Sequence, residues 1–182
     1  MNWVDLVMVV LLALGINSGR KSDFFTELLI FLGVLVTGCF SLHFYVRFGK
    51  LLNDTVVLPP HSQELLAFII ISGVLVTLTL LAKGGWLVII KINIIRHVDN
   101  WGALTFAILK SYFLCGLVLF ALLISGYPSI ERFARESFSF KVFRKAPHWI
   151  YSICYTGFIG NLFPDEPLNQ KAFRVIQESS SK

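Results

Sequence analysis

Three apolar runs, each about long enough to cross a lipid bilayer, constrain this chain more than any other feature of its sequence. They cover residues 24–46, 65–82 and 103–125; the second contains no charged residue and the third contains only Lys110. A helix needs about 20 apolar residues to cross a hydrocarbon core of about 30 Å. We therefore expect all three runs to be transmembrane helices.

A shorter apolar run, residues 3–16, precedes them. A signal peptide carries positive charge ahead of its apolar part, whereas this run begins with Asp5. We expect a retained membrane helix, and a re-entrant segment is the alternative because the run is short.

The composition agrees with a membrane protein. Apolar side chains make up 55% of the 182 residues and charged ones 15%, and the mean hydropathy is +0.72. A soluble domain is usually about 45–50% apolar and about 25% charged. We predict an all-α, multi-pass membrane protein with about four transmembrane helices and interfacial amphipathic segments. Residues 1–126 form its four-helix membrane domain, and residues 127–182 form an amphipathic, aromatic-rich tail.

The net charge of +5 does not indicate nucleic acid as a partner, because the basic residues lie between and after the membrane-length runs. Basic flanks are typical of membrane helices, since positive charge stays in the cytoplasm on insertion and attracts anionic lipid. Four crossings put both termini on one side, and that side has a small excess of nearby basic residues. We expect the lipid bilayer as a partner and both termini in the cytoplasm.

Turn signals predict where the helices end. Pro59 and Pro60 lie in a predicted loop over residues 47–63. Gly84 and Gly85 predict a bend after the third apolar run.

Beyond that bend, residues 86–95 have apolar side chains at helical spacing with basic residues between them. This pattern predicts a helix lying in the membrane interface, and an extension of the preceding helix is the alternative. The last membrane helix is expected over residues 102–125, ending at Gly126. In the tail we expect a surface helix over residues 130–138 and, at residues 149–163, an interfacial patch in preference to a fifth crossing.

Small residues four positions apart recur in three of the runs. This spacing lets membrane helices approach closely, and close packing has to hold them together because lipid tails are as apolar as the helices themselves. Chance is the alternative for any single helix. The predicted packing residues are Gly33, Thr37 and Ser41 in the second helix, Gly73 and Thr77 in the third, and Ala103, Ala107 and Ser111 in the fourth.

Lys110 lies seven residues after Ala103, so both residues lie on nearly the same helix face. A charge inside the bilayer costs about 2.5–3.5 kcal/mol on insertion scales, and such residues normally face a partner or a cavity. The alternative is that the long lysine side chain reaches the headgroups.

Three acidic residues are candidate partners for Lys110. Asp5 and Glu27 lie early in the first and second helices, and Asp99 is predicted to cap the fourth. The starts of the second and fourth helices share one side of the membrane, whereas the first helix starts on the other side. We therefore expect Glu27 to pair with Lys110 near one membrane face.

The sequence contains no recognised catalytic motif. It lacks a glycine-rich phosphate loop, a Gly-x-Ser-x-Gly elbow and a His-Glu-x-x-His pair. The four histidines and three cysteines have no metal-ligand spacing. We predict no enzyme activity, no cofactor and no metal site.

Three segments have a recognisable pattern: "NWVDLVMVVLLALG", with a Trp-x-Asp opening; "FFTELLIFLG", with a glutamate near the head of the second helix; and "VDNWGALTFAILKSYFLCGLVLFALL". Together they resemble the colicin V production protein family, the CvpA-type membrane proteins. In the last segment Asp99, Ala103, Ala107, Lys110 and Ser111 match the family's aspartate, its two small residues and its basic residue beside a small one. The resemblance covers roughly residues 2–126.

The resemblance implies an accessory protein of the bacterial inner membrane, linked to toxin production or export. It implies a homo-oligomer or an envelope transport partner, and no catalytic activity. Two functions are open: a membrane accessory or scaffold protein, and a small oligomeric channel or transporter in which Glu27 and Lys110 line a polar path.

Overall fold

The computed structural model describes residues 2–55, 59–89, 96–160 and 169–178, and in these ranges the chain forms helices and no strand. The helices are α1 (Trp3–Gly19), α2 (Phe24–Thr55), α3 (Pro60–Ile89), α4 (Arg96–Leu123), α5 (Pro128–Glu136), α6 (Phe138–Phe143), α7 (Lys145–Cys154), a π-helical turn (Tyr155–Ile159) and α9 (Gln170–Glu178). A helix satisfies its own backbone hydrogen bonds, as lipid requires.

Three of these helices are long and apolar enough to cross a membrane, over Phe24–Asn53, Ser62–Gly85 and Asp99–Leu123. The apolar helix α1 is shorter, at 17 residues. The predicted class, an all-α multi-pass membrane protein, is confirmed.

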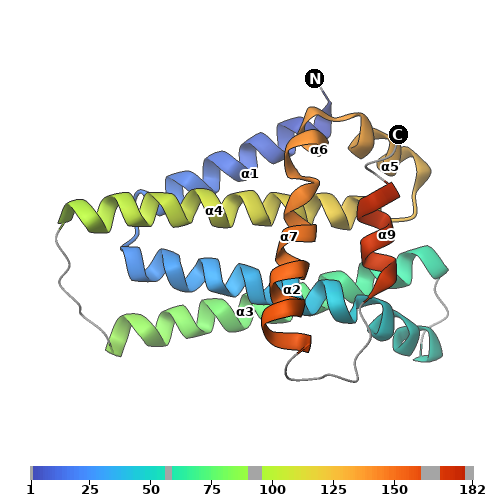
Figure 1. Ribbon diagram of the computed structural model, residues 1–182, viewed down its shortest axis with the longest axis horizontal. Helices are drawn as coiled ribbons and strands as arrows, with labels where there is room; N and C mark the ends of the chain where they lie inside the picture. The colour runs from blue at the N-terminus through green and yellow to red at the C-terminus, as the bar shows by residue number, and fades with distance from the viewer. Residues whose placement is uncertain (1, 56–58, 90–95, 161–168, 179–182) are drawn as a thin grey trace.

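The four apolar helices form a row in the order α1, α4, α2, α3 (Figure 1). Helices α2 and α4 run in the same direction, and α1 and α3 run against them. Helix α4 therefore lies between the two helices that begin the chain, and α3 packs on the far side of α2.

The predicted loop over residues 47–63 is wrong for most of its length. Helix α2 continues to Thr55 and α3 already begins at Pro60, while residues 56–58 lie outside the described part of the chain. Proline is tolerated in the first turn of a helix, where its missing N–H has no intrahelical partner. The two helices also support each other beyond the apolar run, because Gln63 Nε2 donates a hydrogen bond to Asn53 Oδ1 at 2.6 Å.

The predicted bend at Gly84 and Gly85 is also wrong, because α3 continues through both residues to Ile89. This favours the alternative of an extended third helix, since glycine is tolerated in membrane helices. The interfacial helix expected over residues 86–95 falls mostly outside the described residues, which resume at residue 96.

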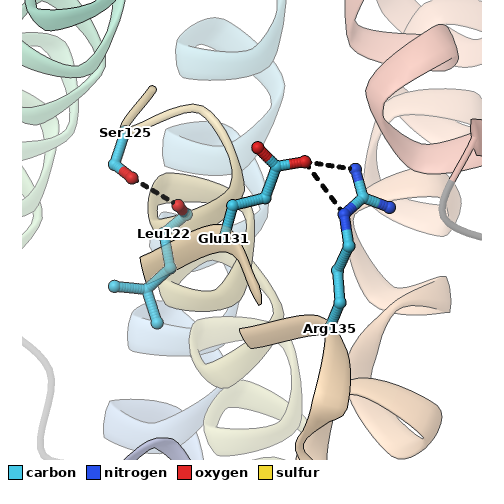
Figure 2. A network of polar contacts seen from close by, with 4 residues as sticks. All are labelled: Leu122, Ser125, Glu131 and Arg135. Atoms are coloured by element: carbon cyan, nitrogen blue, oxygen red, sulfur yellow. Dashed lines mark hydrogen bonds and ion pairs between the residues drawn. The ribbon is translucent and has the colours of Figure 1, made fainter. Parts of the chain in front are cut away.

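Helix α4 begins six residues before the predicted position and ends at Leu123. Gly126 follows with a φ of 70°, a left-handed conformation that favours glycine after a helix. In this turn the Ser125 hydroxyl donates to the carbonyl of Leu122 at 2.7 Å (Figure 2).

The predicted surface helix at residues 130–138 is divided in two by Ser137, whose hydroxyl accepts a hydrogen bond from the backbone N–H of Phe140 and caps α6. Figure 2 shows Glu131 and Arg135 one turn apart on α5, where two guanidinium nitrogens donate to the same carboxylate oxygen.

Helix α7 lies across α4 and α2 instead of running beside them (Figure 1). This orientation does not favour a fifth crossing. Helix α7 packs on Gly38 and Gly116, well inside the spans of α2 and α4, so the expected interfacial position stays a prediction. The inward side chains of α7 join a core with α2 and α4, and a second core lies where α1 and α4 meet α5 and α6. The tail therefore packs on the membrane helices.

Candidate functional site

The structure brings Lys110 of α4 and Glu27 of α2 together, with Nζ of the lysine 2.5 Å from Oε2 of the glutamate. Glu27 is fully buried and Lys110 is 8% exposed. Lys110 lies eleven residues after Asp99, the start of a 25-residue span, which is about 16 Å along the helix and close to the middle of that span. Glu27 lies only three residues after Phe24, the start of the α2 span. The lysine side chain therefore runs from the middle of its own span back toward that membrane face and meets a buried carboxylate there.

Aromatic rings surround the pair on both sides. Phe24 and Phe31 of α2 lie one turn before and one turn after Glu27, and both pack on Phe106 of α4, at centroid distances of 5.4 and 5.3 Å. Phe31 also packs on Phe113 at 6.0 Å. These rings keep water and lipid away, so each charge depends on the other for compensation.

The carboxylate of Glu27 has unused hydrogen-bonding capacity. Among the described residues neither of its oxygens has an aligned hydrogen-bond donor, although Oε2 touches the lysine ammonium. The contact is therefore an ion pair held by charge, and removal of Lys110 would leave the buried carboxylate with no compensation from the described residues.

Asp99 was expected to cap the fourth helix, and this is wrong. Helix α4 begins at Arg96, so Asp99 lies within its first turn. Its Oδ1 accepts a hydrogen bond from the backbone N–H of Phe24 at 2.7 Å, so it caps α2 instead. The first N–H groups of a helix have no intrahelical acceptor, and a carboxylate from the neighbouring helix supplies one here.

Asp5 lies at the start of α1, at the opposite helix ends from Asp99, and it too joins two elements by hydrogen bonds. Its Oδ1 accepts from the backbone N–H of Ser139 at 2.8 Å and from the Ser139 hydroxyl at 2.7 Å. The side-chain amide of Asn2 donates to the carbonyl of Phe133 at 2.5 Å. The start of α1 is therefore tied to α5 and α6, far from Lys110.

The small residues of α4 pack against α1. A Cβ atom added to Gly19 would lie 2.0 Å from Cβ of Ala107, and one added to Gly15 would lie 2.0 Å from Oγ of Ser111. Ala103 is buried at the same interface, since its carbonyl also lies within 4 Å of that added atom on Gly19. Gly15 and Gly19 were missed by the sequence analysis, although "GINSG" has the same four-residue spacing.

The small residues of α2 face α3. A Cβ on Gly33 would lie 2.2 Å from Thr79, and the hydroxyl groups of Ser41 and Ser72 are 2.9 Å apart. Thr37 is buried, and among the described residues its hydroxyl has no hydrogen-bond partner.

Gly73 and Thr77 lie on the outward face of α3. Nothing within the described chain comes within 4 Å of a Cβ built on Gly73, and the exposed Thr77 donates only to the carbonyl of Gly73 in its own helix. The chain itself packs α3 through Ser72 and Thr79 and leaves these two residues free.

A second polar junction, also missed, joins the tail to α2. His43 Nδ1 lies 3.0 Å from the Tyr151 hydroxyl, which accepts from the backbone N–H of Asn169 at 2.8 Å. The Asn169 amide donates to the carbonyls of Leu42 and His43. These residues are 18 to 127 positions apart, so no local sequence pattern marks them.

In the described ranges, no three His, Cys, Asp or Glu side chains lie close enough together to hold a metal ion. The arrangement around Glu27 and Lys110 fixes helices by buried charge, and the two aspartates tie helix ends together.

Comparison with known proteins gives a family match. The colicin V production protein family matches residues 4–147, which include Asp5, Glu27, Asp99 and Lys110. No curated protein and no solved structure matches the chain. The family is one of membrane proteins linked to colicin V production and is not a family of enzymes. Because the match covers most of the sequence and all four apolar helices, the chain belongs to the colicin V production protein family.

Proposed function

We propose that this chain is an accessory or scaffold protein of the cell envelope, which sits in the bacterial inner membrane with both termini in the cytoplasm. In this proposal it contributes to colicin V production or export by holding a transport partner within the membrane. Its family supports the link to colicin V production.

The exposure of α3 carries the proposal. The span Ser62–Gly85 is the most apolar of the three, but only 11% of it is buried within the chain, against 44% and 56% for the spans of α2 and α4. Gly73 and Thr77 lie on its outward face and leave room for close approach. A helix of this kind suits a membrane partner that packs along its length.

The buried pair has a supporting role in this proposal. Glu27, Lys110 and Asp99 fix α2 against α4, and α3 packs tightly on α2 through Gly33 and Ser41. The outward face of α3 is therefore presented by a rigid support.

The alternative is a small oligomeric channel or transporter with Glu27 and Lys110 along a polar path. Both residues are buried between two helices of one chain, and a row of helices one layer deep cannot enclose a channel by itself. This function requires a ring of copies.

Photo-crosslinking in living cells tests the proposal. A photo-reactive residue is placed at Leu81, which is 67% exposed and lies on the face of α3 that carries Gly73 and Thr77. The matched control is Leu14, which is 62% exposed and lies, like Leu81, toward the C-terminal end of its helix. Mass spectrometry then identifies the adducts.

We expect adducts from Leu81 with a discrete envelope transport protein and few from Leu14. Adducts only with a second copy would instead favour the oligomer, and an ion leak in liposomes that Lys110→Leu abolishes would then identify the channel. Lipid adducts alone, equally from both positions, would contradict the proposed partner.

A further inference from the structure

A hollow of about 350 Å³ lies between the end of α1 and the start of α4. It is lined by Gly19, Arg20, Ser22, Asn100, Trp101 and Leu104. Neither the packing of α1 on α4 nor the Glu27–Lys110 pair uses the polar side chains of this hollow.

Three residues that line the hollow carry hydrogen-bond donors without a partner in the described chain. They are the guanidinium group of Arg20, the amide of Asn100 and the indole N–H of Trp101, all on exposed residues. The Ser22 hydroxyl already donates to the carbonyl of Ser18 at 3.1 Å. A site with several free donors and no free carboxylate in its lining suits an anion.

The position of the hollow places it at the boundary between membrane and water. The apolar helix α1 ends at Gly19, and the spans of α2 and α4 begin at Phe24 and Asp99. Trp101 is 71% exposed there, and tryptophan is enriched at this level of membrane proteins. Leu104 continues from the hollow toward the apolar part of α4.

Among the described residues, Arg20 is the only charged side chain in the lining of the hollow. Lys21 adds a second cation next to Arg20, while Asp23 is the exposed acid on the same turn. Asp99, next to Asn100, is a second carboxylate and accepts the N–H of Phe24. These two acids balance the two cations, so the guanidinium group within the lining, and not a net positive charge, is what favours an anion.

We propose that this hollow binds the phosphodiester headgroup of an anionic membrane lipid. Arg20 pairs with the phosphate, Asn100 and Trp101 donate hydrogen bonds to its oxygens, and the acyl chains run along Leu104. The site does not depend on the proposed accessory function, because it lies away from the outward face of α3.

Native mass spectrometry of the full-length protein in detergent tests this site. The protein is mixed with equal amounts of phosphatidylglycerol and phosphatidylcholine, which share a phosphodiester but differ in net charge. We expect about fivefold more phosphatidylglycerol adducts, since one basic side chain contributes about 1 kcal/mol near an anionic lipid surface. Arg20→Gln should remove this preference and Arg20→Lys should retain part of it.

The matched control is Lys50→Gln, which removes an exposed cation at the opposite end of α2 and should leave the preference intact. Equal binding of the two lipids by the unmodified protein, or equal loss in the Arg20 and Lys50 variants, would overturn the site. If millimolar inorganic phosphate displaced phosphatidylglycerol completely, the ligand would be a free phosphate ion and the lipid assignment would be wrong.

Discussion

At the residue scale, Glu27 and Lys110 are two buried charges, and each depends on the other for compensation. Removing one partner of a buried ion pair costs about 3–5 kcal/mol, whereas replacing both with apolar residues is often neutral. The lack of any aligned donor to Glu27 among the described residues makes Lys110 its main compensation.

Glu27→Leu and Lys110→Leu should therefore each reduce stability strongly, and the double variant should recover much of the loss. Thermal unfolding in detergent, with protein accumulation in membranes as a second measure, gives the three values for a double-mutant cycle. Additive effects would mean that the two charges do not interact.

Asp99 gives a second prediction at this scale. Asp99→Ala removes the acceptor for the Phe24 N–H and should cost about 0.5–2 kcal/mol, while Asp99→Asn should keep most of the stability because asparagine also caps helices. Hydrogen exchange should become faster in the first turn of α2 and stay unchanged at the start of α4. Faster exchange in α4 alone would show that Asp99 caps its own helix.

The sequence identified the two charges and their pairing, because connectivity places the starts of the second and fourth helices on one side. It did not identify the helix that Asp99 caps. A carboxylate just before an apolar run is typical of a cap for its own helix, and only the packing of α2 on α4 gives it a different partner.

At the element scale, α1 approaches α4 closely because its glycines have no side chain at the contact. Gly19 and Gly73 provide a matched comparison, because both lie in apolar helices but only Gly19 has a neighbour within 4 Å of an added Cβ.

Gly19→Ala should destabilise the protein by about 1–3 kcal/mol through overpacking against Ala107. Gly73→Ala should be neutral or stabilising by up to about 1 kcal/mol, since alanine is the better helix former. Thermal unfolding in detergent measures both. The double variant Gly19→Ala with Ala107→Gly should regain stability, and equal effects at Gly19 and Gly73 would contradict the close approach of α1 and α4.

The ends of the elements were harder to predict than their existence. Apolar runs reveal where a helix lies in lipid, but they do not show how far it continues into water. Helix α2 extends nine residues past its apolar run to Thr55. Contacts with α3 support this extension, and a pattern of apolar residues cannot predict them. Gly84 and Gly85 weaken a helix only slightly, so α3 passes through them.

At the scale of the whole molecule, the topology we propose has four crossings, with both termini on one side of the membrane. The short turn between α1 and α2 then lies on the other side, together with the start of α4. The order of helices in the row was not predictable, because each helix carries small residues that could have packed on several neighbours.

Cysteine labelling tests this topology. Lys21→Cys lies in the turn after α1 and Ser129→Cys lies on α5, and both positions are exposed. The three native cysteines are buried, so labelling of the unmodified protein gives the background signal. With cytoplasmic termini, a membrane-impermeant maleimide should label Cys at position 21 in intact cells and at position 129 only after the inner membrane is opened. The reverse pattern would place the termini outside.

The place of α4 between α1 and α2 also has a consequence for the order of synthesis. Lys110 is translated 83 residues after Glu27, which at about 5–20 residues per second is a delay of about 4–17 s. During that interval Glu27 lacks its ammonium partner, so the first turn of α2 has to stay near the wet surface of the bilayer. Helix α2 therefore reaches its final position only after Lys110 has been synthesised.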